Sequence, residues 1–96
     1  MLSQVTIKTE APMTLKPLLR SAIQNETKVL QQGIKRTLER LAAFEQQYGM
    51  RSDEFERRFE AGEIQETLSF IDWLMEIRAL QLLNEQDQAL KNARFA

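Results

Sequence analysis

The stretch SFIDWLMEIRALQLL, residues 69–83, decides which folds are open to this chain. Ten of its fifteen residues are apolar, although Asp72, Glu76 and Arg78 interrupt the run. The apolar side chains recur at helical spacing and fall on two neighbouring stripes. The Leu68 stripe consists of Leu68, Ile71, Met75, Ala79 and Leu82, and the Trp73 stripe consists of Phe70, Trp73, Leu74, Ile77 and Leu80. Because one antiparallel neighbour covers one stripe, this helix needs two neighbours.

The stretch belongs to a helix expected over 66–92, and two more helices are expected before it. Apolar residues three, four or seven apart predict a long helix over 14–48. A short connector helix is expected over 52–61. Residues 1–13, which contain the alternating segment QVTIKT, are expected to form an extended arm. The fold class is therefore all-α, with a single domain in which the second long helix returns antiparallel to the first.

Four residues indicate how these helices begin, end and cross. Thr14 and Ser52 carry hydroxyl groups that suit the N-caps of the first two helices. Gly49 suits a left-handed C-terminal cap of the long helix. Gly33 lies inside that helix and indicates a bend or a close crossing of another element.

The composition excludes several classes of function. The 96 residues are 43% hydrophobic and 28% charged, which is typical of one globular domain with a thin core. The chain has no Cys and no His, so disulfides, thiol nucleophiles, zinc sites of the usual kind and Ser-His-Asp triads are excluded. It has no Gly-rich phosphate loop, no signal-peptide core and no apolar run of about 20 residues. We therefore expect a cytoplasmic protein without a membrane span.

The charge is unevenly distributed along the chain. Residues 1–51 hold eight Lys or Arg against four Asp or Glu, and residues 52–96 hold five against ten. One interpretation is that two solvated surfaces of a helical hairpin attract each other. The other is a basic face for an acidic partner or for nucleic acid.

The unequal lengths of the two long helices point to a partner. The first is expected to be longer than the third by about 15 Å, and its overhang carries Leu15, Leu18, Leu19 and Ile23. We expect a homodimer that packs through this overhang and through the Trp73 stripe, with Phe70, Trp73, Ile77 and Leu80 as its interface residues. The alternative is that the N-terminal arm folds back over the overhang.

No constellation of side chains points to catalysis or to a cofactor. Asp72 and Glu76 are four residues apart on one helix, but carboxylate-bridged metal sites in bundles also use His, which this chain lacks. The best basic patch lies along the first helix and consists of Lys28, Lys35, Arg36 and Arg40. It is sparse for nucleic-acid binding unless a dimer brings two copies together.

The run FEQQYGMRSDEFERRFEAGEIQETLSFIDW, residues 44–73, resembles a family of small helical prokaryotic proteins. The matching residues are Phe44, Glu45, Tyr48, Gly49, Met50, Ser52, Phe55, Phe59, Gly62, Glu63, Phe70 and Trp73. Ile64 stands for a Leu of the family pattern, Asp72 for a Glu, and the acidic run after the Leu is thinner here. The resemblance implies a helical fold and, as a role, the antitoxin side of a toxin–antitoxin pair.

Three functions follow as hypotheses. The first is a non-catalytic, antitoxin-like module that binds and neutralises a partner protein. The second is a dimeric nucleic-acid-binding regulator, or a structural helical protein. The third, an enzyme, is the least supported, and we expect the protein not to be one.

Overall fold

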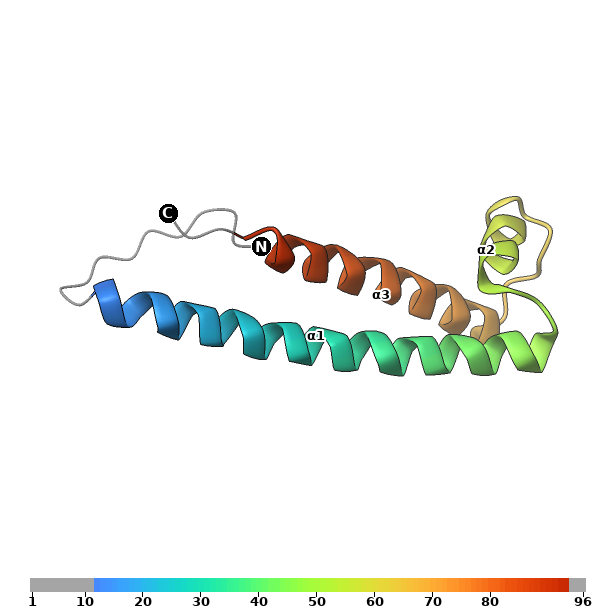
Figure 1. Ribbon diagram of the computed structural model, residues 1–96. Helices are drawn as coiled ribbons and strands as arrows, with labels where there is room; N and C mark the ends of the chain where they lie inside the picture. The colour runs from blue at the N-terminus through green and yellow to red at the C-terminus, as the bar shows by residue number, and fades with distance from the viewer. Residues whose placement is uncertain (1–11, 94–96) are drawn as a thin grey trace.

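The computed structural model describes residues 12–93, with side chains from Thr14, and they form three α-helices and no strand. These are α1 (Pro12–Tyr48), α2 (Ser52–Glu60) and α3 (Leu68–Lys91). Figure 1 shows α1 and α3 lying side by side, with α2 at the end where the chain turns. The expected all-α fold of a long, a short and a second long helix is confirmed. The arm expected over residues 1–11 lies outside the described residues.

The two long helices run antiparallel, and three contacts define their register. Gln31 Nε2 donates to Asp87 Oδ2 over 3.1 Å, Arg40 Nη1 lies 3.0 Å from Glu76 Oε1, and the Tyr48 and Ser69 hydroxyl oxygens are 2.6 Å apart. α1 has 37 residues and α3 has 24, so α1 extends about 20 Å further. Because the turn joins their other ends, the overhang consists of the first part of α1 (Figure 1).

The start of α1 corrects two expectations. Thr14 was expected to be the N-cap and Pro12 to lie in the extended arm, but the helix already begins at Pro12. A proline suits the first helical position, because its φ is already helical and its missing N–H would have no partner there. Pro17 consequently lies inside the helix, where it removes one backbone hydrogen bond.

Ser52 has a different role from the expected one. The N-cap of α2 is Arg51, and no side chain caps that position. The Ser52 N–H instead donates to the Glu45 carboxylate over 2.7 Å, and the Ser52 hydroxyl accepts a 3.0 Å hydrogen bond from Trp73 Nε1. Gly49 has φ +62°, which confirms the left-handed turn at the end of α1.

The start of α3 lies two residues beyond the expected Glu66. Thr67 is its N-cap and accepts from the Phe70 N–H over 3.1 Å. Gly62, with φ +74°, turns the chain between α2 and α3. No helix within residues 12–93 is both long enough and apolar enough to cross a membrane.

The core is concentrated at the turn end of the hairpin. Leu41, Phe55, Trp73 and Ile77 are buried there, and partly buried residues from all three helices pack against them. The Phe55 ring stacks on Trp73 with centroids 3.9 Å apart and planes within 5°. Phe44 and Tyr48 stack on the same indole at 5.5 and 5.6 Å. The indole of Trp73 therefore ties α1, α2 and α3 together.

Candidate partner-binding surface

The Trp73 stripe of α3 forms the core of the single chain, and this corrects the expected interface. Trp73 has no exposed surface and Ile77 is buried. Phe70 and Leu80 are partly buried and pack against the same core cluster. The rings of Phe44, Tyr48 and Phe55 surround this stripe, so α1 and α2 supply both of its neighbours. A partner chain cannot reach Trp73 without unfolding the turn.

The Leu68 stripe is the one left uncovered. Leu68 is 83% exposed, Met75 62%, Leu82 54% and Ile71 39%. These four residues make up most of the large apolar side chains that the two long helices expose within the described region. They share one side of α3, turned away from α1.

Helix α2 leaves the Leu68 stripe free because it packs on another side of α3. Its Glu60 pairs with Arg78 at 2.8 Å, and its Glu56 lies 3.5 Å from Arg78 and 3.4 Å from Gln81. These contacts hold α2 over the flank of α3 that carries Arg78 and Gln81. The opposite flank, which carries Asp72 and Glu76, faces α1, whose Arg40 pairs with Glu76 at 3.0 Å.

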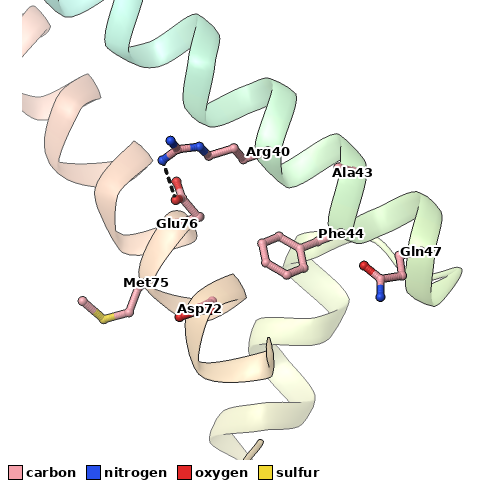
Figure 2. A pocket seen from close by; sticks show the side chains of 7 residues that line it. All are labelled: Arg40, Ala43, Phe44, Gln47, Asp72, Met75 and Glu76. Carbon is pink, nitrogen blue, oxygen red and sulfur yellow. Dashed lines mark hydrogen bonds and ion pairs between the residues drawn. The ribbon is translucent and has the colours of Figure 1, made fainter. Parts of the chain in front are cut away.

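An open groove of about 400 Å³ runs along that second flank, between α1 and α3. Its lining residues are Arg40, Ala43, Phe44, Gln47, Asp72, Met75 and Glu76. Figure 2 shows Arg40 of α1 and Glu76 of α3 reaching across it to form their ion pair. Met75 belongs both to the groove and to the Leu68 stripe, so the two features make one continuous surface.

Asp72 and Glu76 lie in different surroundings. Glu76 is neutralised by Arg40 at 3.0 Å, while Asp72 is exposed and makes no ion pair within residues 12–93. No group of three acidic, His or Cys side chains that would hold a metal ion occurs among the described residues. The groove therefore combines the apolar side chains of Ala43, Phe44 and Met75 with one carboxylate, Asp72, that makes no ion pair among the described residues.

Three of the four overhang residues are better covered than expected. Leu18 is exposed, whereas Leu15, Leu19 and Ile23 are of intermediate burial. Val29, further along α1, is exposed as well. The overhang therefore presents isolated apolar side chains rather than a broad patch.

The four basic residues of α1 do not form one patch. Lys28 and Lys35 are seven residues apart and share one side of the helix, whereas Arg36 follows Lys35 by one residue and lies about 100° around the axis. Arg36 and Arg40 share that other side, and Arg40 is engaged with Glu76. In one chain, the arrangement gives two pairs of cations on different faces.

The sequence shows both apolar stripes of α3, but the interface was predicted on the Trp73 stripe, which is buried, and not on the Leu68 stripe, which is exposed. The signal that separates them is aromatic content. Phe70 and Trp73 lie on the buried stripe, and the expected turn region supplies Phe44, Tyr48 and Phe55 to pack on them. The Leu68 stripe has no ring and therefore no part in that cluster.

The residues of the 44–73 motif contact one another around the turn. Glu45 accepts from the Ser52 N–H, Ser52 accepts from Trp73, and Tyr48 stacks on Trp73. These contacts give the motif a structural role in closing the hairpin. No protein-family model, curated protein or solved structure matches the chain.

Proposed function

We propose that this chain is a non-catalytic protein-interaction module of the antitoxin type, which binds a second protein and neutralises it. The observation that carries the proposal is the exposure of large apolar side chains on both long helices, outside a core that is already complete at the turn end. Exposed apolar surface of this kind is typical of a protein-binding site. The resemblance of residues 44–73 supports the antitoxin role.

The chemistry of the surface favours binding over catalysis. The groove offers apolar side chains and one carboxylate, Asp72, without an ion pair among the described residues, and the chain lacks His, the most frequent general base, and Cys, a strong nucleophile. The exposed face of α1 around Ile34, Leu38 and Ala42 suits an amphipathic helix of a partner, in the helix-in-groove mode. We expect the protein to work in the cytoplasm.

Co-expression with the product of the neighbouring gene tests this function. A toxic neighbour should stop growth alone and should be tolerated when this chain is present. A variant with Leu38→Glu would test the exposed α1 face, where Leu38 is 51% exposed, and Gln32→Glu, at an exposed position on another side of the same helix, would serve as its control. A neighbour that is harmless, or that remains toxic in the presence of the chain, would contradict the proposal.

The nucleic-acid-binding alternative stays a prediction that depends on a dimer. It requires Lys28, Lys35, Arg36 and Arg40 of two chains to act together. Binding to DNA that weakens steeply with salt would support it. Failure to retard any DNA at low salt would remove it.

A further inference from the structure

We propose that the Leu68 stripe is a self-association surface, covered by α3 of a second copy that runs antiparallel about a two-fold axis at Met75. The inference rests on the proposed function only in treating the exposed stripe as a protein contact. It goes further by naming the occupant, its direction and its register. Three features of the described residues support it: the spacing of the stripe, the position of Asp72 and the charge of the two ends.

The spacing of the Leu68 stripe is symmetric about Met75. Its apolar positions, 68, 71, 75, 79 and 82, are separated by three, four, four and three residues. A two-fold axis at Met75 reverses the helix direction and matches each position with its mirror position. Leu68 then faces Leu82, the large Ile71 faces the small Ala79, and Met75 faces its own copy. A stripe that is self-complementary in this way is what an isologous interface requires.

The same axis gives Asp72, which makes no ion pair within residues 12–93, a cationic neighbour. Asp72 lies three residues before the axis, so it is level with position 78 of the second copy's α3. Within each chain, Gly33 approaches Leu83 and Arg40 pairs with Glu76, so that level of α3 lies beside residues 36–40 of α1. Asp72 and Arg40 line the same groove. The two-fold axis places the grooves of both copies on the same face of the dimer. Asp72 therefore comes beside Arg36 and Arg40 of the second copy.

Arg36 is available for this contact. It is exposed and makes no ion pair within residues 12–93, whereas Arg40 already neutralises Glu76. The interface would hold this Asp–Arg contact twice, once on each side of the axis. Two such contacts favour one register over others that bury the same apolar side chains.

The charge of the two ends of the hairpin selects the antiparallel direction. Residues 45–76, which form the turn end, hold three Arg against nine Asp or Glu. The remaining described residues hold eight Lys or Arg against four Asp or Glu. Antiparallel packing places the acidic end of one copy beside the basic end of the other, while parallel packing would place like ends together. Helix α2 does not cover the centre of the stripe, because Leu68, Met75 and Leu82 stay exposed beside it.

Cysteine cross-linking tests the direction and the register, since the native chain has no Cys. Met75→Cys should form a covalent dimer with a short bis-maleimide. Leu68→Cys alone should not, because its two copies would lie about 21 Å apart along the helices. A mixture of Leu68→Cys and Leu82→Cys should cross-link as the heterodimer. Cross-linking of Leu68→Cys alone, or none for Met75→Cys, would overturn the proposal.

A charge exchange tests the contact between Asp72 and Arg36. Asp72→Lys and Arg36→Glu should each raise the dimer dissociation constant about tenfold, because each creates two like-charge contacts. The double variant should recover to within about threefold of the native value. Lys28→Glu, on another side of α1, is the matched control and should leave dimerisation unchanged. If the free-energy losses of the two single variants simply added in the double variant, Asp72 and Arg36 would not be in contact.

Light scattering over a range of concentrations completes the test. A native mass of two chains that falls to one chain for Met75→Glu, with unchanged helical circular dichroism, is the expected result. A folded native monomer at all concentrations would overturn the inference and leave the stripe to a different protein. The neutralisation assay is separate: a monomer that still neutralises its partner refutes only this inference, and a dimer that neutralises nothing refutes only the proposed function.

Discussion

Gly33 lies inside α1 opposite Leu83 of α3, and the structure has room for a side chain there. A Cβ built on Gly33 would lie 3.5 Å from both terminal carbons of Leu83, which is ordinary van der Waals contact. We therefore expect Gly33→Ala to raise the free energy of unfolding by about 1 kcal/mol, through better helix propensity. Urea unfolding followed by circular dichroism measures it.

Gly49→Ala is the matched control for this substitution. Gly49 has no atom within 4 Å of an added Cβ, but its φ of +62° is costly for any residue with a side chain. The same exchange should lower the free energy of unfolding by about 1–2 kcal/mol at this position. If Gly33→Ala destabilised the protein as much as Gly49→Ala, the crossing would be tighter than the contact distances indicate.

Asp87 makes the stability of the hairpin depend on pH. It is buried, and its Oδ2 accepts from Lys91 Nζ at 2.9 Å and from Gln31 at 3.1 Å. The hydrogen bond from Lys91, and then that from Gln31, hold the pKa of the Asp87 carboxyl below its ordinary value. A lowered pKa in the folded state means that this stabilisation is present above about pH 4, the unfolded pKa, and is lost as the pH falls through the folded one.

Asp87→Asn tests this pH dependence. The variant should be less stable than the native chain at pH 7, and the difference should shrink as the pH falls below about 4. Thermal unfolding at several pH values measures both. Gln88→Asn, at an exposed neighbouring position, is the control. A stability difference that stayed constant down to pH 2 would show that charge plays no part in the contact.

At the scale of the elements, the attachment of α2 depends on the hydrogen bond from Trp73 to Ser52. Trp73 is fully buried, so Ser52→Ala would leave its indole N–H without this 3.0 Å partner. We expect a loss of about 1–3 kcal/mol in the free energy of unfolding. In a Trp73→Phe background the same substitution should cost almost nothing, because the donor has gone.

A double-mutant cycle measured by urea unfolding gives the coupling between Ser52 and Trp73. Gln31→Ala, which removes the amide bonded to Asp87 away from the turn end, is the control and should be additive with Trp73→Phe. Equal costs for Ser52→Ala in both backgrounds would mean that Ser52 acts only locally at the start of α2.

The elements themselves could be predicted from the sequence because their signals are local. The periodicity of α1, the left-handed turn at Gly49 and the short helix after it all depend on neighbouring residues. The expected cap at Thr14 was wrong because a proline at the first helical position starts a helix as well as a hydroxyl residue does. Ser52 was misread because its hydroxyl accepts from Trp73, 21 residues away, and no local pattern indicates that contact.

The candidate site was harder to predict, because both stripes of α3 are apolar and adjacent. Which of them becomes core depends on where α1 and α2 place their rings, and this is a property of the tertiary structure. Phe55 of α2 stacks on Trp73 at 3.9 Å, so the Trp73 stripe becomes the core. The surface on the opposite side of α3 follows as a consequence, with Leu68 and Met75 left exposed.

At the scale of the whole molecule, the hairpin is long, thin and unequally stabilised along its length. Its principal extents are 59 × 22 × 19 Å, and its buried core cluster lies at the turn end. Away from that end, the described contacts between the long helices become sparse: Leu30, Thr37 and Asp87 are the buried residues there. Stability should therefore fall from the turn towards the open end, since local opening follows the density of buried contacts.

Hydrogen exchange of the backbone amides measures this gradient. Amides of α1 between residues 18 and 25, which lie beyond the last described turn of α3, should exchange by local fraying, at least about tenfold faster than those between residues 37 and 48. The latter face Trp73 and its surrounding rings and should exchange only when the chain unfolds globally. Amides of α3 from Trp73 to Leu80 serve as the internal reference, because they pack on the same core and should match the slow set. Uniform protection along α1 would mean that the open end is held by contacts beyond those of residues 12–93. If that extra protection disappeared on dilution, the additional contacts would come from a second chain.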